Sequence, residues 1–195
     1  MPASAVDVQP VPGTSKLVVA ASASTREVVG PLKSIIHSRR ALYLVDVADG
    51  SFTLAVGDAN VFDSYRQLAA PHAGGEYAFA DPDKGVVITD VTTGKSRTVK
   101  GCPVRPLACR FSPSDRYLFV GGCGEDRAGG LAVYDLTTEE WVGAVATKGW
   151  VVLDLSYSAS ANLLTCTSGS GVDRQITVWD MKGIVDPAAK KKEKK

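Results

Sequence analysis

One short pattern returns four times along this 195-residue chain at a nearly constant interval. Each copy is an apolar run, an aspartate, an apolar residue and then turn-forming residues: LYLVDVADG, VVITDVTTG, LAVYDLTTE and ITVWDMKG. The aligned aspartates stand 44, 45 and 45 residues apart, and they are Asp46, Asp90, Asp135 and Asp180. A fixed period of about 40–45 residues indicates a repeat architecture with one supersecondary unit per repeat. Because these aspartates recur in every repeat, we expect them to hydrogen-bond the turn that follows and not to form a catalytic set.

A second element repeats in the same phase, as a strand, a polar or proline-containing turn and another strand. It is clearest in CRFSPSDRYLFVGG (109–122) and LSYSASANLLTCTS (155–168), weaker at 66–80 and weakest at 9–22. The turn residues supply the φ values that a hairpin needs. The flanking runs are rich in Val, Leu, Tyr and Phe, which favour half-buried strands. Two hairpins per period predict an all-β chain of four-stranded units.

A four-stranded unit of this period is typical of a blade of a β-propeller. We expect about four blades, the last incomplete, near 1–57, 58–101, 102–147 and 148–183, and then a basic disordered tail at 184–195. The predicted strands lie near 5–11, 16–22, 41–47 and 51–56; 62–69, 76–80, 85–91 and 95–100; 105–111, 117–122, 130–136 and 140–146; and 151–157, 163–168 and 175–181. No fourth strand is apparent in the last blade.

The last two repeats resemble the WD40 family. That family's pattern runs from Gly-His through a Phe-Ser-Pro-Asp turn, a Ser-Gly-Ser stretch and an Asp to a strand ending in Trp-Asp. The corresponding residues are Gly101, 111–115 (FSPSD), Gly121, Gly122, Asp126, Tyr134 and Asp135 in the third repeat, and Gly149, 168–170 (SGS), Asp173, Trp179 and Asp180 in the fourth. The first two repeats match only in their strands and closing aspartate. The resemblance implies a propeller that serves as a binding scaffold.

The sequence departs from the WD40 pattern at the histidine that follows the glycine, where Cys102 and Trp150 stand instead. In the family this histidine belongs to a buried hydrogen-bond network, so Asp126 and Asp173 lack their partner here. We expect these two acids to bond backbone N–H groups of the adjacent turn. Trp179 is expected in a core strand, so that its truncation harms folding more than truncation of Trp141 in an outer strand.

Propellers that resemble this one usually close with seven blades, so four blades leave the question of closure open. The chain is either part of a larger propeller, an open half-propeller held by a partner, or a small four-bladed ring. In the first two cases the strand at 175–181 has an open edge, which pairs with another chain or aggregates. Association with a partner subunit, or with itself, is therefore expected.

A long insertion interrupts the first blade between its second and third strands, at 23–40. Residues 30–40 are predicted to form a short amphipathic helix. Basic residues beside an apolar stripe suit an acidic groove, RNA or a partner helix. The alternative is a loop packed on the blade edge with solvated charges. The candidate partner-binding residues are Arg26, Lys33, Ile36, His37, Arg39 and Arg40.

Neither composition nor motifs indicate catalysis, a cofactor or a metal. The two histidines, His37 and His72, accompany no nucleophile or metal motif. The four cysteines lack zinc-ligand spacing, so reduced and partly buried thiols are expected. The glycine-rich stretch 121–130 precedes a strand and lacks Gly-Lys-Ser/Thr, which favours a flexible hairpin loop over a phosphate site. Because 22 Lys and Arg balance 21 Asp and Glu, a globally basic surface is excluded.

The sequence therefore predicts a non-catalytic protein-interaction scaffold, a WD-repeat subunit of a larger multiprotein assembly. Its expected partners are other protein subunits that complete or cover the open propeller edge. One alternative is an RNA- or ribosome-associated module that uses the basic insertion and the lysines of the tail. Another is a propeller enzyme of lactonase or hydrolase type. With no stretch of about 20 apolar residues and no secretory signal, we expect no membrane contact and a cytoplasmic or nuclear location.

Overall fold

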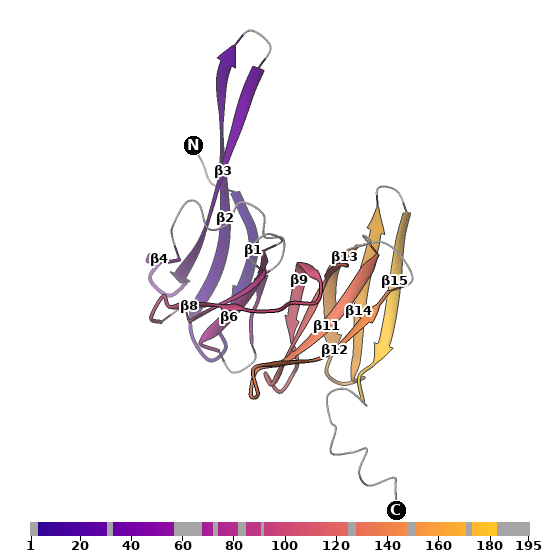
Figure 1. Cartoon of the computed structure of the whole chain (residues 1–195). Helices are drawn as coiled ribbons and strands as arrows, with labels where there is room; N and C mark the ends of the chain where they lie inside the picture. The colour runs from indigo at the N-terminus through magenta and orange to yellow at the C-terminus, as the bar shows by residue number, and fades with distance from the viewer. Residues whose placement is uncertain are drawn as a thin grey trace, which may run out of the picture.

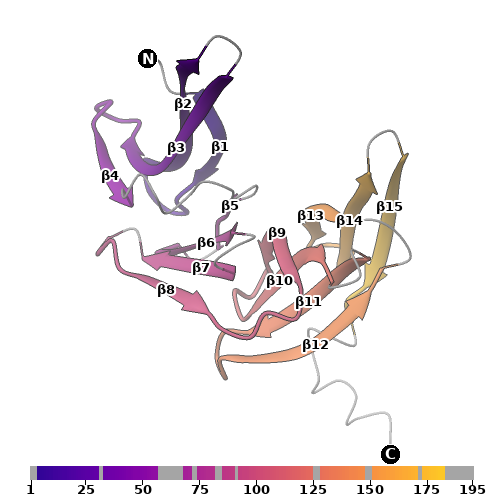
Figure 2. The ribbon, with the colours of Figure 1, turned by 45° about the horizontal axis from the view of Figure 1, so that its top comes forward.

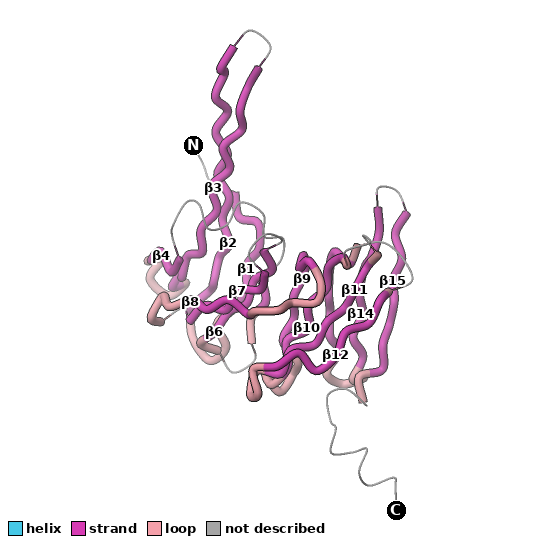
Figure 3. Tube along the Cα trace, viewed as in Figure 1, coloured by secondary structure: helices cyan, strands magenta, loops and turns pink. Residues whose placement is uncertain are grey.

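The structure is a computed structural model, and it describes the backbone of residues 4–30, 33–56, 68–71, 74–81, 85–90, 92–124, 128–147, 151–170 and 173–182. Side chains are described for the same residues except 4–7, 22–30, 33–42, 54–56, 170 and 173. All the regular secondary structure in this part of the chain consists of β-strands (Figure 3). The predicted all-β class is confirmed. The basic tail from 184 onward lies outside the described residues.

Four antiparallel sheets follow one another along the chain, and each is one blade. Blade one contains β1 (Ser4–Pro10), β2 (Lys16–Gly30), β3 (Lys33–Asp46) and β4 (Phe52–Val56); blade two contains β5 (Leu68–Ala69), β6 (Glu76–Asp81), β7 (Gly85–Asp90) and β8 (Ser96–Val99). Blade three contains β9 (Arg105–Phe111), β10 (Tyr117–Cys123), β11 (Gly129–Asp135) and β12 (Glu140–Ala146); blade four contains β13 (Val152–Ser158), β14 (Leu163–Ser170) and β15 (Asp173–Asp180). The predicted strands are confirmed to within a few residues, apart from the second and third strands of blade one, which are much longer. Of the first strand predicted for blade two, the described part is 68–69.

The blades stand face to face in a fan (Figures 1 and 2). Their first strands lie next to one another, since β5 contacts both β1 and β9, and β9 contacts β13. Blades one and four lie at opposite ends of the fan in both views. The four blades therefore do not close into the small ring that was one of the three alternatives.

A separate apolar core fills each space between neighbouring blades. Successive residues of a strand point to opposite faces, so Tyr77 and Phe79 of β6 pack against blade one, while Ala78 and Ala80 pack against blade three. In β10, Leu118 and Val120 face blade two, whereas Tyr117 and Phe119 face blade four. The middle blades are thus buried on both sides, and this alternation holds the fan together.

Glycines allow two close approaches of the backbone, one between blades three and four at Gly121 and one between β9 and β10 within blade three at Gly122. A Cβ on Gly121 would lie 2.4 Å from Cγ1 of Val152, and one on Gly122 would lie 1.9 Å from the carbonyl oxygen of Arg105. Both glycines belong to β10, and Gly130 belongs to β11. The prediction of a flexible hairpin loop over 121–130 is therefore wrong at both ends of that stretch, because 121–123 and 129–130 are paired strand positions.

Trp179 does not lie in the core as predicted. It is half-buried, because β15 is the last strand of the last sheet and lies at the rim of the core between blades three and four. Trp141 is also half-buried and is better anchored than expected. Its Nε1 donates a 2.8 Å hydrogen bond to the carbonyl of Lys100, and its ring lies 5.0 Å from that of Tyr134.

Candidate functional site

The four repeat aspartates each accept a hydrogen bond from the turn that follows, as predicted. Oδ1 of each carboxylate accepts from the backbone N–H two residues later, and the donors are Ala48 (3.0 Å), Thr92 (2.8 Å), Thr137 (2.8 Å) and Lys182 (3.0 Å). The backbone N–H groups of Thr93 and Thr92 lower the pKa of Asp90 below its ordinary value. These carboxylates serve the same local purpose in every blade, so they are structural positions.

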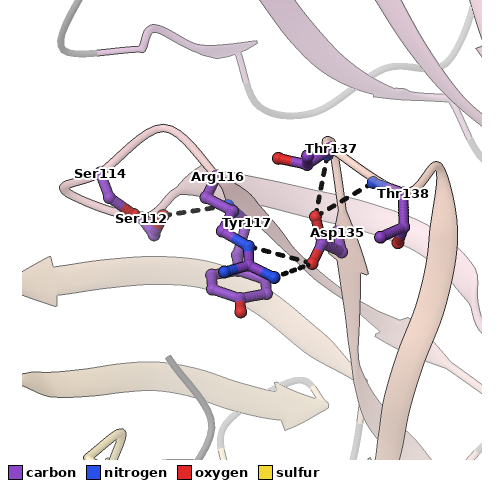
Figure 4. A network of polar contacts seen from close by, with 7 residues as sticks. All are labelled: Ser112, Ser114, Arg116, Tyr117, Asp135, Thr137 and Thr138. Carbon is purple, nitrogen blue, oxygen red and sulfur yellow. Dashed lines mark hydrogen bonds and ion pairs between the residues drawn. The ribbon is translucent and has the colours of Figure 1, made fainter. Parts of the chain in front are cut away.

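Asp135 carries the most extensive of these networks (Figure 4). Its side chain is 3% exposed, and its Oδ2 accepts hydrogen bonds from Nη2 (2.8 Å) and Nε (3.1 Å) of Arg116. Burial raises the pKa of the Asp135 carboxyl, but the bonds from Arg116 and from the N–H groups of Thr137 and Thr138 outweigh it and lower the pKa. The preceding turn is closed by Ser112, whose Oγ accepts from the N–H of Tyr117 at 3.1 Å.

Asp126 lies outside the described residues, and Asp173 is described only as a backbone position at the start of β15. The expectation that their carboxylates bond the adjacent turn therefore stays a prediction. His72 also lies outside the described residues, and the side chain of His37 is not among those described.

The insertion of blade one is a continuous antiparallel hairpin. Strands β2 and β3 pair from Lys16 opposite Asp46 to Gly30 opposite Lys33. Strand β1 pairs with β2 only as far as Ser22, and β4 pairs with β3 only as far as Leu42. The part beyond these positions extends from the blade as a two-stranded ribbon, at the top of Figure 1. We call residues 23–40 the ribbon.

The predicted helix at 30–40 is therefore wrong. The register of the core strands continues without interruption as far as 28 and 34. The ribbon is rich in β-branched Thr, Val and Ile, which favour strands. Its Gly30-Pro31 pair is a strong turn signal in the sequence, and β2 ends at Gly30. Apolar periodicity alone did not distinguish a short helix from this hairpin.

The structure brings all six candidate partner-binding residues into this one ribbon. Across the two strands, Arg26 pairs with Ile36, Thr25 with His37 and Ala23 with Arg39. Lys33 lies at the tip opposite Gly30, and Arg40 pairs with Ser22 at the base. Residues 23–40 carry four Lys or Arg and one Glu. The ribbon is thus a basic projection from the sheet of blade one.

Two further surfaces are open at the ends of the fan. Among the described strands, β15 is the edge of its sheet, and its Ile176 and Val178 are 72% and 53% exposed. At the other end Phe52 of β4 is 70% exposed. The open edge of the strand at 175–181 was predicted from the missing strand of blade four. The surface at Phe52 was not predicted, although continuous apolar runs in β2 and β3 gave the signal.

The described cysteines are free thiols. Cys109 and Cys166 are buried, while Cys102 and Cys123 are half-buried. Burial raises the pKa of Cys102 to about 11. Among the residues with described side chains, no three His, Cys, Asp or Glu lie close enough together to hold a metal ion. Among the described residues, no helix is long and apolar enough to cross a membrane.

Comparison with solved structures identifies the class of fold. The chain is similar to one in the crystal structure of a nidogen/laminin complex, with a TM-score of 0.64 and 9% identity over 89% of this chain and 60% of that one. It is similar to hydrazine synthase of Kuenenia stuttgartiensis, with a TM-score of 0.64 and 16% identity over 91% and 46%. It is also similar to TolB from Acinetobacter baumannii, with a TM-score of 0.59 and 14% identity over 89% and 41%.

These three structures are β-propellers, and together with the four consecutive sheets they show that this chain has a β-propeller fold. The chain spans about half the length of the propeller chains it matches. No protein-family model matches it, and neither does any curated protein sequence. Membership of the WD40 family stays an interpretation of the last two repeats.

Proposed function

We propose that this chain is a non-catalytic protein-interaction scaffold, a WD-repeat-like subunit of a larger assembly, and that the ribbon is its main contact with a protein partner. The observation that carries this proposal is the length of β2 and β3. They have 15 and 14 residues, whereas the other strands have at most eight. A projecting segment on a rigid scaffold is where binding function usually resides.

The backbone of the ribbon supports binding by strand addition. Beyond Ser22 and Leu42, β2 and β3 pair only with each other among the described strands. Each outer edge of the ribbon therefore offers N–H and C=O groups to an extended peptide. The excess of Lys and Arg in 23–40 favours a peptide with acidic residues. The chemistry of the expected partner is thus an extended, acidic protein segment.

The test is a variant in which 23–39 is replaced by Asn-Gly, the two-residue turn that suits a hairpin, so that the paired residues Ser22 and Arg40 flank the turn. The pairing of the lower parts of β2 and β3 is kept, so blade one should fold. We expect proteins that cross-link to the full chain in extract of its native cell to be lost with this variant, while circular dichroism and the unfolding midpoint stay the same. A folded variant that retains every cross-linked partner would contradict the proposal that the ribbon is the main contact with a protein partner.

The basic ribbon also supports the second candidate, an RNA- or ribosome-associated module. Phosphate contacts release counterions, so RNA affinity falls steeply as salt rises. Binding of single-stranded and structured RNA to the full chain at two salt concentrations separates the candidates. Affinity that falls steeply with salt and is lost with the trimmed ribbon would favour RNA. The third candidate, a lactonase- or hydrolase-type enzyme, is tested by ester and lactone hydrolysis with and without divalent metal.

A further inference from the structure

Blade one has a second apolar face, on the side away from blade two. Val18, Ala20 and Leu44 pack toward blade two, so the alternate residues of β2 and β3 face the other way. That outer face consists of Val8, Leu17, Val19, Tyr43, Val45 and Phe52. Its exposed fractions reach 45% at Val8 and 70% at Phe52, and the rings of Tyr43 and Phe52 lie 6.1 Å apart. Exposed apolar patches of this kind mark interaction surfaces.

The strands of blade one have the sequence of an interior blade. Strand β2 contains LVVA and β3 contains LYLV, which are continuous apolar runs typical of strands covered on both faces. Strand β10 contains the similar run YLFV, and blades two and four do cover both of its faces. Blade one therefore stands at the end of the fan with a face that an adjacent blade would bury.

Blade four presents the other end. Leu164 and Cys166 are buried against blade three, so Leu163, Thr165 and Thr167 of β14 face away from it. On β15, Val178 pairs with Thr165 and Ile176 pairs with Thr167 on this same outer face. On β13, the exposed Asp154 and Ser156 pair with Thr167 and Thr165 and so lie on this outer face too. Blade four thus has a mixed outer face, apolar on β15 and polar on β13, which differs from the apolar outer face of blade one.

We infer that a second copy of this chain closes the fan. The outer face of blade four of each copy packs on the outer face of blade one of the other, and the two copies form one ring of eight blades. Propellers have about four to eight blades, so such a ring lies within the known range. The two-fold arrangement uses both ends of each copy and leaves no end face uncovered.

The area of the faces favours this arrangement over a contact through blade one alone. A four-stranded face with strands about 4.8 Å apart and about six residues long at about 3.3 Å per residue covers about 400 Å². Specific interfaces bury about 800 Å² per partner. The sheet of blade four has three described strands, so each contact between the two end faces is limited to about 300 Å² per copy. One contact of either kind falls short of a specific interface, whereas the two contacts of the ring bury about 600 Å² per copy, the lower end of the range for specific interfaces. The end faces and the ribbon consist of different residues, so the pairing of the end faces does not depend on what the ribbon binds.

The experiment is sedimentation of the full chain at low micromolar concentration, with lysine placed on each end face. We expect the unaltered chain to sediment at twice its 20.5 kDa mass. Phe52→Lys and Val178→Lys should each weaken dimerisation at least tenfold. Because both side chains are more than half exposed, the folded fan should tolerate the charge. The matched control is Val142→Lys, at a 51% exposed valine on the outer strand of blade three, which should leave the dimer intact.

Mixing the two variants tests the head-to-tail arrangement. A Phe52→Lys copy keeps its blade-four face, and a Val178→Lys copy keeps its blade-one face. The mixture should therefore regain one intact interface and associate more strongly than either variant does alone, although more weakly than the unaltered chain. A monomeric unaltered chain would overturn the inference. So would a dimer that Phe52→Lys disrupts and Val178→Lys does not, because that result assigns the contact to blade one against blade one. Circular dichroism of each variant confirms that the fan is folded.

Discussion

Arg116 donates two hydrogen bonds to one carboxylate oxygen of Asp135, at 2.8 and 3.1 Å, and so joins two turns of blade three. The other oxygen of the same carboxylate accepts hydrogen bonds from the backbone N–H groups of Thr137 and Thr138. Asp135→Ala should therefore cost about 2–3 kcal/mol in the free energy of unfolding, because the lost hydrogen bonds involve a charged group. Urea denaturation measures the cost. Asp90→Ala, which removes a more exposed copy of the same turn contact, should cost less, and an equal loss would contradict the role of burial at Asp135.

The lowered pKa of Asp135 predicts a dependence of stability on pH. An ordinary aspartate has a pKa of about 3.9 when unfolded, and the folded pKa of Asp135 lies below the ordinary value. Its contribution is thus present above about pH 4 and is lost as the pH falls through the folded pKa. The difference in the free energy of unfolding between the unaltered chain and Asp135→Asn should therefore become smaller as the pH falls through this range. A difference that stays constant down to acid pH would contradict the assignment.

Gly122→Ala should be among the most damaging substitutions in the fan. The added Cβ would lie 1.9 Å from the carbonyl oxygen of Arg105, and a backbone atom of a paired strand cannot move aside. Overpacking of this kind costs about 1–3 kcal/mol and occasionally more. The matched control is Gly143→Ala in β12, where a Cβ would meet no atom within 4 Å. Thermal unfolding should separate the two variants, and similar midpoints would contradict the close approach of β9 and β10.

Trp141→Ala should destabilise the chain at least as much as Trp179→Ala, which reverses the expectation from sequence. Both indoles are half-buried, but the Trp141 Nε1 hydrogen bond ties the outer strand of blade three to the segment that leaves blade two. Trp141→Phe keeps an aromatic ring near Tyr134 and should cost about 1 kcal/mol through the lost hydrogen bond. Denaturant midpoints of the three variants provide the test. A much larger loss for Trp179→Ala would support the core position that the sequence predicted.

Cys123 should react first when the native chain is treated with iodoacetamide at pH 8. Cys109 and Cys166 are buried, and the raised pKa of Cys102, about 11, lowers its thiolate fraction about a hundredfold. Mass spectrometry of digests identifies the labelled positions, and the chain unfolded in urea should label at all four. Cys123→Ser should remove the first site of modification. Early labelling of Cys109 or Cys166 would show that the blades open more readily than their packing indicates.

Much of the fold was predictable because the signals were local. An aspartate that bonds the N–H two residues ahead acts within one turn, so the four repeats marked their blades at Asp46, Asp90, Asp135 and Asp180. Alternating and continuous apolar runs placed the described strands to within a few residues, apart from the extended pair in blade one. The prediction of a helix at 30–40 was wrong because a short amphipathic stretch fits both the helical and the strand periodicity. Its pairing depends on a partner strand across a turn.

The sequence by itself determined the all-β class, the blade period and the turns, since these depend on residues that contact one another within a few positions along the chain. Only the tertiary structure decided which faces of the strands are covered. Leu17 and Val18 are adjacent and equally apolar, yet Val18 is buried against blade two while Leu17 lies on the open face of blade one. The reason is physical: a side chain's burial depends on which blade packs on its face of the sheet, and that contact joins segments far apart in the sequence.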